Sequence, residues 1–506
     1  MAARSSRRSF GARALLAIAL LLGFYVLGLA VIAACAGGVW LQVAAGHLYL
    51  KLILVLVVVG GSVAWGLVRS LVAFGDGFEP PGPEITRKDE PALFEVIDQV
   101  ADAMHTRLPE HVYLFPDVNA FVAEVGGFLG FGTRRVMGIG VGLLQVDTVQ
   151  QLKATLAHEF GHYEGGDTRL GGFLYRTRSG LARVIQNLGG GLTGGLFVWY
   201  FKMFLRITHG MSRAQELAAD EASVRVAGTA AHIEGLRREA HGGVMFSTFL
   251  QTEVSPLVNE GYRPVDLFKG FRLARKEMHR SGARKDLDEL LAKAETDPYD
   301  THPAFPERIA YAESLPIVTC ESDDRPAREI LADAEAVERR LGVLFLAKAT
   351  DDKPLQSVTW RDSGPKVFGP KLERDAESFV AALKKAGFAV ETPLEAAREA
   401  TEALYEDDCV PWVKRVAPNL ERAPSRDAAE RFVAQVAGVC LATALVRRGG
   451  EWRSSPGRPV EVVEGETVHD PFTWAREAMA DDDARDALTE RIENLSTSSA
   501  PAVDAG

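Results

Sequence analysis

The sequence is poor in cysteine and has no excess of basic residues. Its four cysteines are widely separated, so the chain has no C-x-x-C metal or redox motif, and free or buried thiols in a reducing compartment are the favoured interpretation. Lysine and arginine total 57 against 68 acidic residues, a formal net charge of −11, which argues against a nucleic-acid partner. A function must therefore rest on other residue types.

Charged residues are also missing from two long stretches near the N-terminus. Residues 14–34 carry no charge, and at about 1.5 Å per helical residue they would cross the roughly 30 Å of a bilayer core. Residues 48–68 contain a single charged residue, Lys51, close enough to the end of the run to reach the interface. Basic residues flank the pair, so the positive-inside rule predicts a membrane hairpin, residues 1–75, with both ends in the cytoplasm.

A cleaved signal peptide is the alternative for residues 1–34, because Ile32-Ala33-Ala34-Cys35 resembles a lipoprotein cleavage box. The apolar run exceeds a usual signal core, however, and a second full-length run follows it. Cleavage would leave one span and place the rest of the chain outside the cell. We expect instead a multi-pass inner-membrane protein in contact with the lipid bilayer, with its catalytic and C-terminal domains in the cytoplasm.

The chain is organised around the motif His158-Glu159-x-x-His162. On a helix, His158 and His162 lie one turn apart on the same side and can bind one metal ion. Glu159 is rotated by about 100° from His158 and can lean towards the open coordination position as a general base. Taken alone, the motif could also be a helix with two exposed histidines, so the flanking sequence has to decide.

That flanking sequence predicts a helix. Asp147 is a good N-cap, and Gln150 follows three residues later as in a capping box. Gly165 and Gly166 predict the end of the helix.

A third metal ligand is expected from residues 212–220, where Ser212 is placed as an N-cap. A catalytic zinc ion needs three protein ligands and one open position, and Glu216 is the best candidate for the third. Asp220, one turn later, can accept the free ring N–H of a ligating histidine and fix its tautomer. Arg213, before Glu216, can pair with a carboxylate. Each of these residues alone is more typical of a solvated helix.

The segment before the motif predicts a helix followed by a small antiparallel sheet. Apolar spacing indicates a helix over residues 90–104. Short apolar runs separated by glycine-rich turns predict three strands, at residues 112–115, 119–125 and 135–143.

Three segments after the motif are harder to interpret. Residues 168–188 predict an amphipathic helix, and residues 188–205 are apolar but interrupted by five glycines. The second stretch fits an interfacial or re-entrant segment and a buried helical hairpin equally well. His302, within residues 297–309, could donate to an oxyanion on a substrate carbonyl, although a histidine before proline is more often structural.

From about residue 323 the sequence predicts an α-rich domain with no catalytic constellation. Residues 449–466 could form a hairpin, and the small residues of 496–506 predict a disordered tail. We therefore expect four parts: residues 1–75, 76–322, 323–495 and 496–506. The helices predicted in the third part are residues 327–346, 374–386, 393–405, 428–447 and 472–492.

Taken together, these motifs resemble the M48 family of membrane-associated zinc peptidases, which includes the bacterial HtpX type and the eukaryotic CAAX prenyl protease type. The resemblance covers residues 92–315 and the N-terminal hairpin. It rests on four motifs in order: Asn119-Ala120-Phe121, His158-Glu159-Phe160-Gly161-His162, Ser212-Arg213-x-x-Glu216-x-x-Ala219-Asp220, and Thr301-His302-Pro303 with Arg308.

The resemblance implies a zincin-like domain that holds one zinc ion on two histidines and the downstream glutamate, while the motif glutamate activates water. It also implies that Asn119, Ala120 and Phe121 lie on an edge strand that lines the substrate cleft, with His302 near the reacting carbonyl. HtpX-type proteins place two spans between the zinc helix and the third ligand, whereas this chain has one glycine-broken run. The CAAX-type enzymes have many more spans.

The expected fold is α+β and predominantly helical: two transmembrane helices, a zincin-like metalloprotease domain with a small antiparallel sheet, and an appended α-rich domain. The expected function is that of a membrane-anchored zinc metalloendopeptidase acting on a polypeptide substrate, with membrane-protein quality control as a candidate role. The alternative is a non-catalytic membrane scaffold with a structural metal site that works through its C-terminal domain. The complete set of H-E-x-x-H and a downstream glutamate argues against it, because structural zinc sites are usually closed by four Cys or His ligands. The sequence predicts no oligomeric state.

Overall fold

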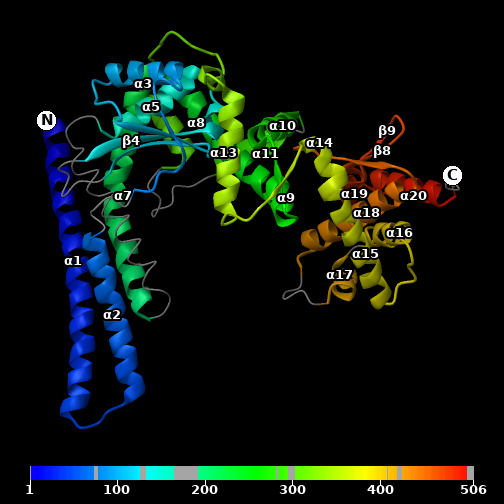
Figure 1. Cartoon of the computed structure of the whole chain (residues 1–506), viewed down its shortest axis with the longest axis horizontal. Coiled ribbons are helices and arrows are strands. Elements are labelled where there is room, and N and C mark those ends of the chain that lie inside the picture. Colours follow the sequence, from blue (N-terminus) through cyan, green and yellow to red (C-terminus); the bar gives the residue numbers. More distant parts are fainter. Residues whose placement is uncertain are drawn as a thin grey trace. The chain divides into compact units, whose positions relative to one another are not determined.

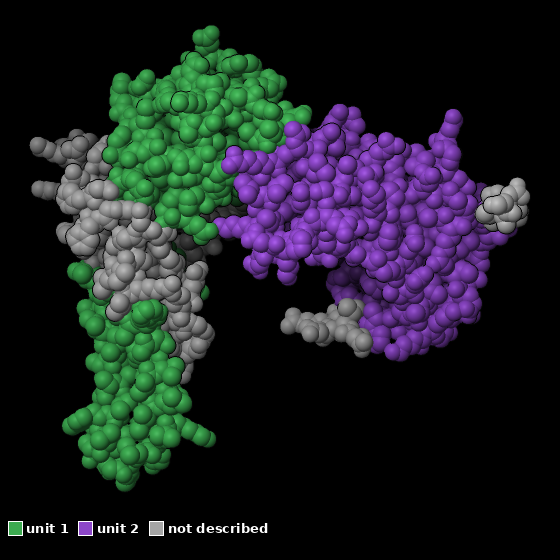
Figure 2. Space-filling model, viewed as in Figure 1, with its two compact units in different colours: residues 1–244, 285–337 green, residues 245–284, 338–506 purple. Residues whose placement is uncertain are grey.

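The computed structural model describes residues 2–72, 78–125, 133–163, 192–280, 283–293, 303–406, 408–418 and 424–497. The chain divides into two compact units (Figure 2). Residues 1–244 and 285–337 form unit 1, and residues 245–284 and 338–506 form unit 2. This division differs from the boundary expected at residue 323. Residues 245–284 belong to unit 2 because their helix packs against later residues; for example, Trp360 Nε1–H donates to the Asp266 carbonyl at 2.8 Å.

Two long apolar helices, α1 (Ala2–Ala44) and α2 (Leu50–Val72), form an antiparallel hairpin in unit 1 (Figure 1). By length and composition, Leu22–Ala44 of α1 could cross a membrane, and the apolar part of α2, Leu50–Trp65, is shorter. Large apolar side chains on the hairpin are exposed, Leu50 by 80 % and Trp40 by 67 %. Such a surface is consistent with the membrane association expected from the sequence.

The third long helix of unit 1, α7 (Leu192–Ala227), is continuous. The sequence suggested an interfacial or re-entrant segment or a helical hairpin at residues 188–205, and a new helix capped by Ser212. For the described residues the re-entrant segment, the hairpin and the new helix start are wrong, and an interfacial position stays a prediction. Ser212 lies inside α7, and the described part of the glycine-broken run is helical. Residues 188–191 and the helix expected at 168–188 fall outside the described residues.

Aromatic packing explains why α7 tolerates its glycines. Phe197 and Phe204 are fully buried in a cluster with Phe24 of α1 and with residues of α2, and the Phe24 and Phe197 rings meet edge to face at 5.2 Å. The Tyr200 hydroxyl donates to the Leu20 carbonyl at 2.7 Å. Burial of several large side chains outweighs the roughly 1 kcal/mol by which each glycine disfavours a helix.

A four-stranded sheet lies beside the motif helix in unit 1. Its strands run in the order β1 (Glu84–Ile85), β2 (His111–Phe115), β4 (Arg134–Gly140), β3 (Ala120–Val125). The sheet is mixed and not antiparallel as expected, because β4 inserts between β2 and β3 and pairs in parallel with β2. Side-chain alternation does not encode strand direction. The strand β3 therefore lies at an edge of this sheet.

The motif helix, α5 (Val149–Gly161), packs against β3 and against α3 (Pro91–Ala103), the helix expected at residues 90–104. It begins one residue later than predicted, with Thr148 and Gln151 forming the capping box in place of Asp147 and Gln150. Tertiary contacts decide between the two neighbouring cap candidates, because the Asp147 carbonyl accepts from Ala327 N–H at 2.9 Å. The helix ends at Gly161, and the predicted stop at residues 165–166 lies outside the described residues.

The connecting helices of unit 1 are α4 (Val141–Leu144), α8 (Thr229–Phe249), α11 (Ala283–Ala292) and α12 (Phe305–Ser314). The ends of α8 and α11 extend into unit 2, as does α13 (Ala334–Ala349). The helix expected at residues 327–346 is divided into a 3₁₀ turn, η2 (Ala327–Ile330), and α13.

Unit 2 is mostly helical, as expected for the C-terminal part of the chain. The stretch expected as one helix at residues 472–492 is two helices separated at Asp481, and residues 449–466 contribute to a three-stranded antiparallel sheet larger than the predicted hairpin. The elements of unit 2 that follow α8 are η1 (Leu250–Val254), α9 (Ser255–Asn259), β5 (Tyr262–Pro264), α10 (Leu267–Arg280), β6 (Gln356–Val358), α14 (Trp360–Ser363), η3 (Gly364–Phe368), α15 (Gly369–Lys385), α16 (Pro393–Ala403), α17 (Val410–Val416), α18 (Arg426–Arg447), β7 (Glu451–Arg453), β8 (Glu461–Glu464), β9 (Thr467–His469), α19 (Pro471–Ala480) and α20 (Asp482–Thr497).

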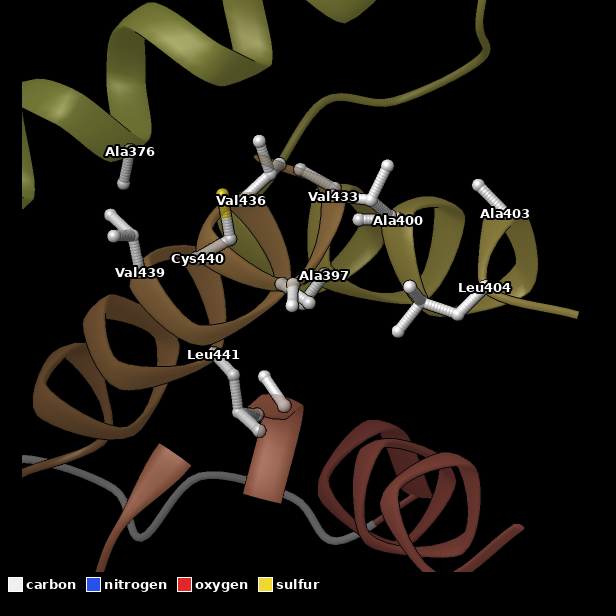
Figure 3. Packing of buried hydrophobic residues seen from close by; sticks show 14 of the residues in the cluster. Ala376, Ala397, Ala400, Ala403, Leu404, Val433, Val436, Val439, Cys440 and Leu441 are labelled. Carbon is white, nitrogen blue, oxygen red and sulfur yellow. The ribbon is translucent and has the colours of Figure 1, made fainter. Parts of the chain in front are cut away.

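The core of unit 2 is built around α18 (Figure 3). Small residues of α16, such as Ala397 and Ala400, pack beside Val433 and Val436 of α18. Although α18 is long and apolar enough to cross a membrane, 72 % of its apolar window is buried inside the protein. It is therefore the core helix of a helical domain.

Glu253 on η1 makes the stability of unit 2 depend on pH. Its carboxylate accepts from Gly457 N–H at 3.2 Å. Burial raises the pKa of Glu253 to about 7, although that N–H favours the charged form. Because its pKa is higher in the folded than in the unfolded state, Glu253 favours folding most at a pH below its unfolded pKa. This contribution to stability is lost as the pH rises through the folded pKa.

We therefore expect Glu253→Gln, which keeps the acceptor oxygen, to stabilise unit 2 by about 1–3 kcal/mol at pH 8 and to change little at pH 4.5. Urea unfolding at both pH values, followed by tryptophan fluorescence, measures this. Glu466→Gln, an exposed change in the same unit, is the control and should behave alike at both. Equal effects of Glu253→Gln at the two pH values would contradict the assignment.

Candidate metal centre

Close packing of α5 against α7 brings the expected metal ligands together. A Cβ on Gly161 would lie 2.9 Å from the Ala219 Cα, so only glycine permits this approach of the two helices. The buried Ser223 hydroxyl of α7 donates to the Ala154 carbonyl of α5 at 2.7 Å and sets the register between them. As a result, Glu216 faces the histidines of α5.

The three expected ligands converge on one point. His158 Nε2 lies 3.5 Å from Glu216 Oε2, and His162 Nε2 lies 3.7 Å from Glu216 Oε1. The two imidazole rings are 4.8 Å apart, with their planes at 83°. A tetrahedral ion with bonds of about 2.0–2.1 Å holds its ligand atoms about 3.3 Å apart. The donor set and its spacing therefore fit a single divalent ion such as zinc.

The ligands differ in their access to solvent. His158 and Glu216 are buried, whereas the His162 side chain is 25 % exposed. His162 is the C-cap of α5, at the end of the helix. The site is therefore anchored in the protein on one side and reachable on the other.

Asp220 lies next to His158, as expected, and is fully buried. Its Oδ1 is 3.0 Å from His158 Nδ1, so the ring N–H at Nδ1 points to the carboxylate and Nε2 is the nitrogen left for an ion. Arg308 on α12 binds the same carboxylate through two nitrogens, at 2.6 Å and 3.1 Å. His232 of α8 approaches it at 3.4 Å.

This arrangement shifts the protonation of the buried groups. Burial and Arg308 both disfavour a charged His158, but Asp220 and Glu216 outweigh them and raise its pKa to about 9. Burial alone would raise the pKa of Asp220, yet His158 and Arg308 hold it well below its ordinary value. Burial lowers the pKa of His232 to about 4, so this ring is neutral. Asp220 and Glu216 therefore favour a positive charge at the His158 ring. A bound metal ion would supply that charge in place of the ring proton.

Glu159 lies beside the ligands and the sheet. A side-chain oxygen of Glu159 and one ring nitrogen from each motif histidine lie within 4.8 Å of one another. Glu159 Oε2 also accepts from Val122 N–H of β3, at 3.3 Å. The same strand residue accepts from the Tyr163 hydroxyl at 2.8 Å, so the motif helix and the edge strand are joined through Val122.

The remaining expected residues are distributed around this centre. Asn119 lines a cavity together with His158 and Glu159. Ala120 is buried at the start of β3, and the Phe121 ring packs against the Phe115 ring at 5.6 Å. His302 lies outside the described residues.

Arg213 has its ion-pair partner on another helix. It pairs with Glu307 of α12 and not with a ligand of the metal centre, and its side chain is 49 % exposed.

Sequence reasoning gave no role to four residues that the structure brings to this region: His232 and Glu239 of α8, Tyr163, and Arg308. Arg308 was noticed only as part of the motif around His302. His232 and Glu239 are seven residues apart, two helical turns, so their shared face was a usable sign. Nothing near them in the sequence indicated which helix they would meet.

Comparison with known proteins identifies part of this chain. Residues 87–315 match the model of peptidase family M48. The chain contains an M48 peptidase domain. This confirms the resemblance drawn from the motifs and, with it, the expectation of a metallopeptidase family.

The M48 domain has relatives among proteins named as proteases. Protease HtpX of Idiomarina loihiensis is 29 % identical over 174 residues, 31 % of this chain and 59 % of that protein. Protease HtpX of Xanthomonas axonopodis is 29 % identical over 195 residues, 34 % of this chain and 65 % of that protein. A Protease HtpX homolog of Methylacidiphilum infernorum is 26 % identical over 255 residues, 46 % of this chain and 75 % of that protein.

The match thus spans less than two thirds of the length of the first two of these relatives, 59 % and 65 %. No solved structure matches the chain.

The contact between Asp220 and His158 makes a prediction about metal affinity. Asp220→Asn removes the charge that orients the ring and deprives the buried Arg308 of its carboxylate, so metal affinity should fall about 10–100-fold and the M48 domain should lose stability. Competition with a chromophoric chelator measures the affinity for zinc. Glu221→Gln, the neighbouring exposed position on α7, is the matched control and should bind like the wild type. Unchanged affinity of Asp220→Asn would show that Asp220 does not orient the ligand.

Proposed function

We propose that the chain is a membrane-anchored zinc endopeptidase that hydrolyses polypeptides at the centre formed by His158, His162 and Glu216. The observation that carries the proposal is the convergence of these side chains from α5 and α7, with a Glu216 oxygen 3.5 Å from His158 Nε2 and 3.7 Å from His162 Nε2. Two nitrogens and one carboxylate are the ligand set of hydrolytic zinc sites, which keep one position open for water. The M48 match and the protease relatives support the same class of reaction.

A zinc ion bound there would polarise the substrate carbonyl and lower the pKa of the attacking water. Glu159 is the residue we assign as general base, because it lies beside both histidines and its Oε2 is held by Val122 N–H. In this role it accepts a proton from water as the carbonyl is attacked and donates it to the leaving amine. His302 stays a prediction for the oxyanion donor.

The substrate would bind as an extended strand along β3. This strand is at the edge of the described sheet, so a peptide can extend the sheet by main-chain hydrogen bonds. Val122, whose main chain already faces Glu159, would place the peptide next to the base. Asn119, directly before the strand, lines the adjoining cavity.

The hairpin of α1 and α2 is proposed to anchor the enzyme in the inner membrane as a multi-pass protein with both ends in the cytoplasm. The HtpX relatives and the exposed apolar side chains of the hairpin support a membrane protein. A role in membrane-protein quality control is proposed for the same reason. Unit 2 is proposed as an accessory domain.

Replacing the base should separate metal binding from chemistry. Glu159→Gln keeps a polar side chain of the same size but cannot take a proton, so cleavage of casein should fall about 10²–10⁴-fold with zinc content unchanged. Glu216→Gln should lose both zinc and cleavage. A chelator should abolish wild-type cleavage, and added zinc should restore it. Loss of zinc in Glu159→Gln, or full activity of that variant, would show that the roles are misassigned.

The orientation of the chain is tested by thiol labelling. In intact cells a membrane-impermeant maleimide should not reach Cys320 of the M48-domain unit, but it should do so after lysis. Ala45→Cys, in the exposed connection between α1 and α2, is the control and should be labelled from outside. Labelling of Cys320 in intact cells would favour the cleaved signal peptide and an external active site.

A further inference from the structure

The M48 domain contains a cavity beside the proposed base. Its volume is about 610 Å³, within the range of ligand-binding pockets. Asn119, His158 and Glu159 are among its lining residues, and the others include residues of α5, α8, α11 and α12. A side chain of a peptide lying on β3 would therefore enter it directly beside the scissile bond.

Glu239 of α8 forms part of the wall. Its carboxylate accepts from the Thr155 hydroxyl of α5, which holds it towards the cavity between the two helices. Burial raises the pKa of Glu239, although Thr155 and Arg308 counter this. A buried carboxylate of this kind is stabilised most by a cation brought against it.

The charges around the cavity do not cancel. Among the lining residues that the structure describes, Asp117, Glu159 and Glu239 contribute carboxylates, and Arg308 is the one arginine or lysine. Arg308 already binds the Asp220 carboxylate through two nitrogens, and His158 faces Asp220 and Glu216. The three lining carboxylates are therefore not balanced by these two cationic groups, and the cavity would repel an acidic side chain.

The rest of the wall is apolar. Leu236, Ala240 and Val244 of α8, Leu291 of α11 and Phe305 of α12 line the cavity. Such walls suit the methylene stem of a long side chain whose charged end reaches a carboxylate.

We propose that this cavity selects substrates with an arginine or lysine next to the scissile bond, and that Glu239 is the residue that recognises its charge. The proposal rests on the peptidase function proposed above. The stem packs on the apolar wall while the cationic end pairs with Glu239, which offsets the cost of burying either charge alone.

The test compares peptides built on a casein sequence that the full-length enzyme cuts, with arginine, norleucine or glutamate at each position flanking the cut bond. Arginine should exceed norleucine in kcat/KM by about tenfold to a hundredfold at one of these positions, as for a charge-assisted hydrogen bond. In Glu239→Gln the ratio should fall close to one. Glu234→Gln, on α8 outside the cavity, is the matched control and should keep the ratio.

A second variant guards against misfolding of Glu239→Gln. Gly243 lines the cavity, and a Cβ added there would meet none of the described atoms within 4 Å, so Gly243→Leu can be accommodated and fills the space. It should slow cleavage of the arginine peptide at least tenfold more than cleavage of an alanine peptide. Equal slowing of both peptides would count against a side-chain pocket.

A binding measurement separates this proposal from the peptidase function. Fluorescence anisotropy with the Glu159→Gln protein should show tighter binding of the labelled arginine peptide than of the norleucine peptide, and Glu159→Gln/Glu239→Gln should remove the difference. That result supports the pocket even where no cleavage is seen. Cleavage without any preference for arginine or lysine, or a preference unchanged in Glu239→Gln, would overturn the proposal and leave the peptidase function standing.

Discussion

The structure of the metal centre depends on one buried charge, the carboxylate of Asp220. It is fully buried, and an unpaired charge in such a position costs several kcal/mol. Arg308 compensates it with hydrogen bonds from two nitrogens, and His158 directs its ring N–H to it. Because these residues lie on α7, α12 and α5, the cost of burying one charge fixes three helices relative to one another. His232 adds a fourth helix, α8, on the remaining side. The metal ligands acquire their spacing from this network before any ion binds.

The same helix that carries Asp220 also joins the centre to the membrane hairpin. At one end of α7, Phe197 and Phe204 are buried against α1 and α2; at the other, Glu216 faces the histidines. Phe204 and Glu216 are separated by about 18 Å of uninterrupted helix. Because α7 is continuous over this distance, the third ligand and the residues that pack on the hairpin belong to one helix. In the proposed enzyme the anchor thereby contributes to the geometry of the site as well as to its location.

Features set by local spacing could be predicted from the sequence, and features set by tertiary contacts could not. His158 and His162 meet because four residues make one helical turn, and Asp220 follows Glu216 by the same spacing. The N-cap of α5 was predicted at Asp147, but the structure has it at Thr148. Both residues are good N-caps, and the choice between them depends on a tertiary contact, the hydrogen bond from Ala327 N–H to the Asp147 carbonyl. Two further predictions were wrong because tertiary contacts decide them. Aromatic packing keeps α7 continuous through Ser212, and the direction of pairing in the sheet depends on β4 lying between β2 and β3.

The edge strand and the base constrain each other in a way that bears on substrate binding. The Val122 N–H donates to Glu159 and the Val122 carbonyl accepts from Tyr163, so both main-chain groups point away from β4. These are the two groups that an added strand would use for its own hydrogen bonds. Under the proposed function, a peptide that pairs with β3 takes over the Val122 N–H and releases the Glu159 carboxylate. A released carboxylate is a stronger base than one that accepts a hydrogen bond, because that bond stabilises its charged form. Substrate binding would therefore increase the basicity of Glu159 at the moment when a proton has to be removed.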